Sequence, residues 1–197
     1  MKNCLLILLA ILAMENLCAQ TRLFEKKPTN FSQAVETVLK DHRNNYRNIE
    51  GELLESELEY EHYASTVTLP GSEYCIIGRY HSVIDTSASW QALMYRNEDF
   101  ASAAKEYKSL FKQLKASPIT EVDGSKLYLD GDMEVPAEEM DFMVTTLQFK
   151  TMDRRYQHFK VELELLYKLN EWVININMVT RKPDDEVRPD WMTSSVQ

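Results

Sequence analysis

The spacing of side chains along the chain changes near residue 97, from the two-residue period of a strand to the period of a helix. Two sets alternate over residues 89–96, as in a strand with both faces partly covered: Trp90, Ala92 and Met94 against Gln91, Leu93 and Tyr95. Asn97 stands where a helix N-cap is expected. Apolar positions then recur at helical spacing and predict an amphipathic helix that ends before Pro118: Phe100, Ala103, Ala104, Tyr107, Leu110, Phe111 and Leu114.

A first helix is predicted nearer the start of the chain. Asn30 can cap it, and Gln33 occupies the reciprocal position of a capping box. The apolar stripe of this helix consists of Phe31, Ala34, Val35, Val38, Leu39 and His42. We expect the helix to extend to about Tyr46.

Residues 54–62 alternate between apolar or aromatic positions and glutamates. Glu55, Glu57, Glu59 and Glu61 fall on one parity, so the pattern predicts a single strand with an acidic outer face. A helix is the alternative interpretation, because Leu54 and Leu58 are also four residues apart and glutamate is a poor strand former. A strand over residues 74–80 follows the turn signal Leu69-Pro70-Gly71, so the two strands are expected to pair as an antiparallel hairpin.

Residues 126–130, 140–150 and 159–168 are further predicted strands, and the clearest hairpin lies at the end of the domain. Asn170-Glu171 separates two alternating runs and is the predicted turn. The register that this turn implies pairs only apolar residues on one face: Leu169 with Trp172, Tyr167 with Ile174, Leu165 with Ile176, and Leu163 with Met178.

The order of these elements predicts an α+β fold. Its simplest packing is a curved antiparallel β-sheet with two main helices on one face, in the approximate order α-β-β-β-α-β-β-β-β. That order resembles, in outline only, TBP-like and secretion-chaperone-like folds. Such a resemblance implies a possible chain layout and no function.

The first 19 residues have the layout of a secretory signal peptide. Lys2 precedes the apolar run 4–13, and a more polar stretch ends at Ala19, after which cleavage is expected. The run is shorter than the roughly 20 residues that span a bilayer. We therefore expect a signal peptide over residues 1–19, a linker over 20–29, one domain over 30–180, a disordered tail over 181–197, and a periplasmic or secreted protein.

The composition and net charge of the chain indicate which kinds of partner it could bind. The chain has 197 residues, a formal net charge of −9 and 44% hydrophobic residues, enough for a substantial core. Its basic residues are scattered among more numerous acidic ones, which argues against binding to nucleic acid, and no later apolar run predicts stable membrane insertion. An acidic chain favours basic partners instead, whether protein or small molecule.

No set of residues predicts catalysis, a metal site or a cofactor. The four histidines have no paired ligand spacing, and Cys75 is the single cysteine after the expected cleavage, with buried surroundings predicted from Tyr74, Ile76 and Ile77. The loop that starts at Asp130 resembles the opening of a calcium loop. Val135 stands where that loop requires glycine, so we expect an acidic surface loop.

The sequence therefore favours a non-catalytic binding module that is secreted or periplasmic. Its candidate binding residues are Glu55, Glu57, Glu59 and Glu61. Two alternatives remain open: a hydrolase that uses scattered carboxylates and tyrosines, and a protein inhibitor or assembly factor that docks through its sheet. Converging carboxylates with perturbed pKa values would favour the first alternative, and an uncovered strand edge would favour the second.

Overall fold

The structure is a computed structural model that describes residues 30–81 and 87–180. The predicted signal peptide, linker and C-terminal tail lie outside the described residues. Within those two ranges, every helix is too short or too polar to span a lipid bilayer.

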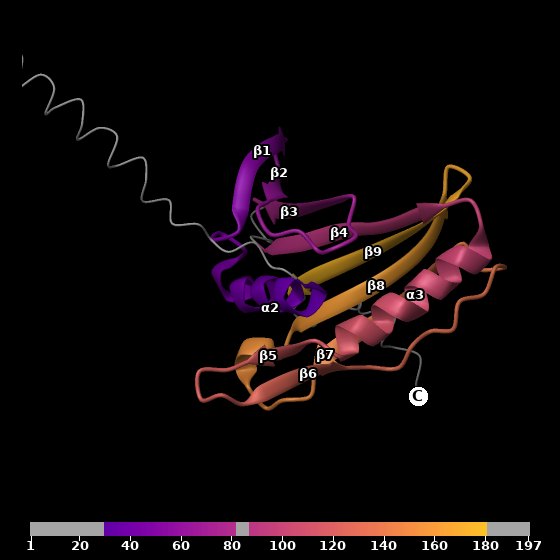
Figure 1. The fold of residues 1–197 in the computed structure, drawn as a ribbon. Helices are drawn as coiled ribbons and strands as arrows, with labels where there is room; N and C mark the ends of the chain where they lie inside the picture. Colours follow the sequence, from indigo (N-terminus) through magenta and orange to yellow (C-terminus); the bar gives the residue numbers. More distant parts are fainter. Residues whose placement is uncertain (1–29, 82–86, 181–197) are drawn as a thin grey trace, which may run out of the picture.

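The described chain folds into one open antiparallel sheet with two α-helices over it (Figure 1). The elements follow in the order α2 (Phe31–Asp41), 3₁₀ helix η1 (His42–Asn44), β1 (Glu50–Ser56), β2 (Tyr60–Ser65), β3 (Tyr74–Tyr80), β4 (Ala88–Asn97), α3 (Phe100–Lys115), β5 (Pro118–Thr120), β6 (Lys126–Asp130), β7 (Phe142–Phe149), 3₁₀ helix η2 (Arg154–Tyr156), β8 (Phe159–Lys168) and β9 (Glu171–Thr180). The predicted α+β class is confirmed.

The sheet consists of two halves that meet where β4 pairs with β9. The strands lie in the order β1-β2-β3-β4-β9-β8-β7-β6-β5, so the last strands of two similar halves pair with each other. Each half begins with a helix, and the two helices contact each other over the sheet. Within the described residues, four strands follow α2 and five follow α3, one more in each half than the sequence predicted.

The first extra strand arises because residues 54–62 form a hairpin and not the single strand that was predicted. β1 ends at Ser56, and β2 begins at Tyr60. The backbone N–H of Glu57 donates to the carbonyl of Tyr60 at 2.9 Å and closes the turn. Leu54 and Leu58 are both exposed, so no core contact holds these residues in one long strand.

The predicted N-terminus of α2 is confirmed, and its predicted end is too late. The Asn30 side chain accepts a hydrogen bond from the Gln33 N–H at 2.8 Å. The α-helix stops at Asp41, and Asn45 and Tyr46 both adopt positive φ angles. This reversal turns Tyr46 into the core, where its hydroxyl donates to the carbonyl of Met178 at 2.9 Å.

Helix α3 starts two residues later than Asn97 would place it. Asp99 is the N-cap, and its carboxylate accepts from the Ser102 N–H at 2.7 Å. Asn97 still belongs to β4, and its side chain accepts from the Asp99 N–H. The predicted inner stripe is buried at Ala103, Ala104, Tyr107, Leu110 and Leu114, while Phe100 and Phe111 are partly buried.

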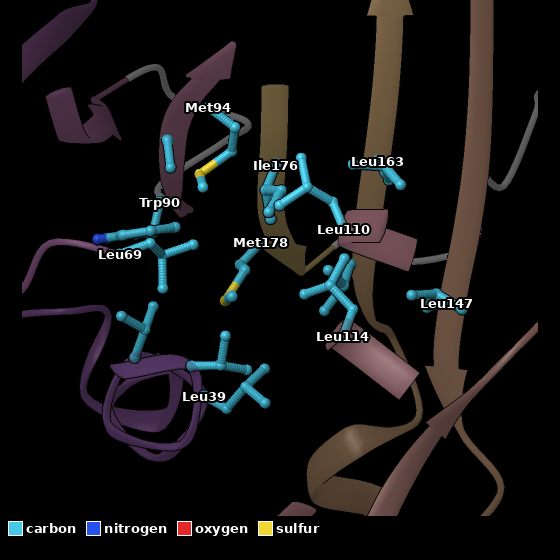
Figure 2. Close-up of a cluster of buried hydrophobic side chains, with 14 of the residues drawn as sticks. Leu39, Leu69, Trp90, Met94, Leu110, Leu114, Leu147, Leu163, Ile176 and Met178 are labelled. Carbon is cyan, nitrogen blue, oxygen red and sulfur yellow. The ribbon is translucent and has the colours of Figure 1, made fainter. Parts of the chain in front are cut away.

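The core lies between the helices and the sheet (Figure 2). Leu39 of α2 and Leu114 of α3 point toward Met178 and Ile176 of β9, and Trp90 of β4 lies beside them. Polar atoms in this layer are paired: the Trp90 indole N–H donates to Ser65 at 2.9 Å. The amphipathic stripes of both helices are thus covered by one sheet face.

The terminal hairpin has a different register from the one predicted. Its turn is Leu169-Asn170, and the observed pairs are Tyr167 with Trp172, Leu165 with Ile174, Leu163 with Ile176, and Val161 with Met178. Leu169 and Asn170 have φ angles of 54° and 65°, as the two central residues of a type I′ turn require. The register is shifted by two residues, which keeps each side chain on its predicted face, and Ile176 is buried as expected.

Replacing Leu169 with Asn should raise the free energy of unfolding by about 0.5–1 kcal/mol, because asparagine adopts the left-handed region at lower cost than leucine. Denaturant titration measures the change. Leu58→Asn is the matched control, since Leu58 is an exposed turn leucine outside the positive-φ set, and it should shift stability by less than about 0.5 kcal/mol. Equal effects of both substitutions would contradict the turn assignment.

Candidate functional site

The histidines do not converge on a metal site in the described part of the chain, where no group of three or more His, Cys, Asp or Glu side chains could hold a metal ion. His42 is buried at the end of α2, with Nδ1 2.6 Å from the carbonyl oxygen of Leu39. Its ring packs against Tyr156 and Phe159. Burial lowers the pKa of His42, so the imidazole is favoured in its neutral form, within the core.

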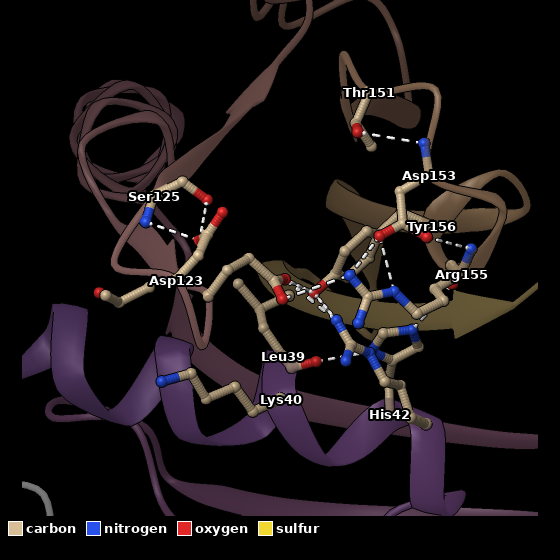
Figure 3. Close-up of polar contacts among 12 residues, drawn as sticks. Leu39, Lys40, His42, Asp123, Ser125, Thr151, Asp153, Arg155 and Tyr156 are labelled. Atoms are coloured by element: carbon tan, nitrogen blue, oxygen red, sulfur yellow. Dashed lines mark hydrogen bonds and ion pairs between the residues drawn. The ribbon is translucent and has the colours of Figure 1, made fainter.

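Among the described residues, charged and polar side chains from three segments converge in a group that we call the Glu121 cluster (Figure 3). Its members are Arg43, Glu121, Asp153, Arg155 and Tyr156, from η1, the β5–β6 loop and the η2 region. Glu121 accepts hydrogen bonds from the Tyr156 hydroxyl at 2.5 Å, from Arg43 at 3.0 Å and from Arg155 at 3.3 Å. The Glu121 side chain is only 12% exposed, so its carboxylate is held by partners on several sides.

The pKa shifts in this cluster favour a structural role for its side chains over a role in acid–base catalysis. The hydrogen bond from Tyr156, together with Arg43 and Arg155, lowers the pKa of Glu121. Burial, reinforced by the hydrogen bond to Glu121, raises the pKa of Tyr156 to about 12. At neutral pH Glu121 stays ionised and Tyr156 stays protonated, so neither is poised to exchange a proton.

The cluster therefore connects η1, at the end of α2, to the β5–β6 loop and to the η2 region. Arg43 also hydrogen-bonds the Tyr156 hydroxyl, and Asp153 pairs with Arg155. Sequence analysis missed this cluster because its members come from positions 43, 121 and 153–156. No local spacing signals that such distant segments meet.

The acidic loop after Asp130 has a structural role along the sheet edge. The Asp130 carboxylate pairs with Lys115 at 2.9 Å and with Lys150. Glu134 accepts from the Val144 N–H at 3.0 Å, so the loop covers part of the edge of β7. A Cβ at Gly131 would lie 2.4 Å from the Thr146 carbonyl oxygen, which shows how closely this loop approaches the strand.

The four predicted binding glutamates lie together on the β1–β2 hairpin but do not form one row. Glu55 on β1 aligns with His62 on β2, and their side chains are 3.2 Å apart. Glu61 projects from the other side, where it accepts from the Tyr63 hydroxyl at 2.7 Å and lies 2.9 Å from His81 Nε2. Glu57 and Glu59 occupy the exposed tip between them. The predicted single row is wrong because the chain reverses at the tip. Residues before and after a turn belong to different strands, so alternate residues do not all project from one face.

The same hairpin exposes apolar side chains. Leu53 is 47%, Leu54 is 56% and Leu58 is 100% exposed. Within the described chain β1 pairs only with β2, so its outer edge is uncovered, although the pairing has two register irregularities. We call residues 53–61 the hairpin surface. It combines an apolar tip, four glutamates and a sheet edge that projects beyond the helices (Figure 1).

Comparison of the chain with protein-family models, with curated proteins and with solved structures gives no match. The geometry of the chain offers the hairpin surface as a candidate binding site and the Glu121 cluster as a candidate stabilising contact.

Replacing Glu121 with Gln should lower the free energy of unfolding by about 1–3 kcal/mol at neutral pH, because charge-assisted hydrogen bonds are lost. The folded-state pKa of Glu121 lies below its ordinary 4.5, so the carboxylate stabilises the fold above that value. This contribution is lost as the pH falls through the lowered pKa. Denaturant titrations at several pH values should show the two proteins converging in acid.

Glu138→Gln is the control for this series, because Glu138 is exposed in the acidic loop. It should change stability by less than about 0.5 kcal/mol at neutral pH. A Glu121→Gln protein as stable as the wild type at neutral pH would show that the cluster does not stabilise the fold.

Cys75 should react slowly with a maleimide in the folded protein and rapidly in denaturant. The side chain is 5% exposed, and burial raises the pKa of its thiol, which reduces the thiolate fraction. The measurement uses a variant with Cys4→Ser and Cys18→Ser, so that Cys75 is the only thiol. Fast labelling under native conditions would contradict the buried position.

Proposed function

We propose that this protein is a secreted or periplasmic, non-catalytic binding module whose contact surface is the hairpin surface. The observation that carries this proposal is the fully exposed Leu58 between Glu57 and Glu59 at the hairpin tip. A large apolar side chain at the tip of a projecting hairpin gains from burial only when a partner covers it. Its acidic neighbours favour a partner with basic residues around an apolar patch.

The exposed edge of β1 supports a more specific alternative, an inhibitor or assembly factor that docks through the sheet. An uncovered edge can accept an added strand. The two register irregularities and the glutamates of β1 are features that hinder such pairing. Side-chain contacts at the tip are therefore favoured over strand addition.

A hydrolase mechanism has weaker support in the described residues. A catalytic acid or base near neutral pH requires a carboxyl group whose pKa is raised toward neutrality. The converging carboxylates, Glu121 and Asp153, have lowered pKa values because Tyr156 and Arg155 hydrogen-bond them. Their arrangement stabilises the charged form and favours a structural role.

The glutamates should act mainly through long-range attraction. A variant with Glu55, Glu57, Glu59 and Glu61 all changed to Gln should associate about tenfold more slowly with a partner captured from the native cell envelope, with a weaker dependence on salt. Its dissociation rate should change little. Surface plasmon resonance at several salt concentrations measures both rates.

Leu58→Ser should instead act through contact, raising the dissociation constant about tenfold with little effect on association. Val122→Ser is the matched control, because Val122 is fully exposed in the β5–β6 loop at the far end of the sheet order. Binding that is unaltered by both the glutamate and the Leu58 substitutions would remove the hairpin surface from the proposal.

A further inference from the structure

Helix α3 carries a basic face that composition alone does not reveal. Lys105, Lys108 and Lys112 are exposed and are spaced by three and four residues, so they follow one side of the helix over about 10 Å. Within the described residues, none of the three has a carboxylate at ion-pair distance. The whole chain has a net charge of −9, so this side of α3 has the opposite charge to the chain as a whole.

Small side chains accompany these lysines. Ala101, Ala104 and Ser109 help to line a shallow groove along α3, with a volume of about 730 Å³. The three lysines line the same groove. The lysines therefore form a row along the middle of the groove, with Ala104 on one side and Ser109 on the other.

The hairpin tip has the complementary pattern. Leu58 is fully exposed, and its neighbours in the sequence, Glu57 and Glu59, are exposed as well. The Glu57 carboxylate accepts a hydrogen bond from the Tyr60 hydroxyl. An acidic tip that carries an exposed apolar side chain is complementary in charge to this row of lysines.

The tip and the groove of one molecule are too far apart to meet. The β1–β2 hairpin forms one edge of the sheet, whereas α3 packs over β4, β9, β8 and β6 (Figure 1). The contact therefore requires two molecules. A two-fold arrangement would let each copy insert its tip into the groove of the other.

We propose that the partner of the hairpin surface is a second copy of this chain, bound through the α3 groove in a two-fold dimer. This inference rests on the proposed function, because it names the partner for the same surface. Leu58 packs beside Ala101 of the partner copy, while Glu57 and Glu59 face the lysines.

Charge reversal tests the dimer by sedimentation velocity in about 0.1 M salt, where a Debye length of about 10 Å screens the net repulsion between copies. The wild type should dimerise. A helix variant with Lys105→Glu, Lys108→Glu and Lys112→Glu should have a dimer dissociation constant at least about tenfold higher. A tip variant with Glu57→Lys and Glu59→Lys should show the same loss.

Mixing the two variants provides the rescue. The helix variant keeps its acidic tip, which fits the unchanged lysines of the tip variant. The tip variant has a basic tip, which fits the reversed α3 of the helix variant. An equimolar mixture should therefore recover a heterodimer. The control changes Lys126, Lys160 and Lys168 to Glu, which gives the same net charge as the helix variant but leaves α3 itself unchanged, and it should dimerise like the wild type.

A monomeric wild type, dimerisation that the reversals leave intact, or a mixture of folded variants that stays monomeric would overturn the dimer. Assemblies larger than a dimer would overturn its two-fold form. These outcomes are separable from failure of the proposed function. A monomeric wild type that still loses its captured partner on Leu58→Ser would leave the hairpin surface as a binding site for a different protein.

Discussion

The antiparallel pairing of β4 with β9 is the interaction on which the rest of the fold depends. These strands are the last elements of the two halves, and their pairing converts two small sheets into one. Trp90 aligns with Met178 and Ala92 with Ile176, so the pairing also joins the two buried faces. Helix α3 packs across this junction, and the Tyr46 hydroxyl connects the end of the α2 region to β9. Neither half alone offers so wide an apolar surface to its helix.

The two ends of the sheet differ in how far their edge strands are covered by other parts of the chain. The candidate site lies at the less covered end. At the β5 end, Glu36 accepts from the Thr120 N–H at 2.9 Å, and the Glu121 cluster ties the next loop to η1 and η2. Along β7, Glu134 satisfies the Val144 N–H. At the β1 end, the hairpin projects with exposed leucines and glutamates. These contacts cover backbone groups of β5 and β7, whereas the outer edge of β1 is uncovered within the described chain.

The four glutamates were proposed from the sequence as binding residues, but their surroundings were not predicted. The alternation of residues 54–62 is genuine, but it does not reveal that the chain reverses at Glu57-Leu58-Glu59, since a hairpin can carry the same alternation as a strand. The exposure of Leu58 follows from that reversal. The Glu121 cluster was missed because it joins distant segments. The basic face of α3 lies on a different side from the predicted buried stripe, so the spacing of Lys105, Lys108 and Lys112 could have revealed it.

The sequence by itself determined the local elements and the faces of their side chains, because helical and two-residue periods are properties of neighbouring residues. It correctly predicted the cap at Asn30, the buried stripe of α3 and the inward side of Ile176. Only the tertiary structure decided the pairing. A shift of two residues in the final hairpin leaves every side chain on the same face, so the apolar pattern cannot distinguish the two registers. The register of the hairpin is set by the Leu169-Asn170 turn and by the pairing of β9 with β4.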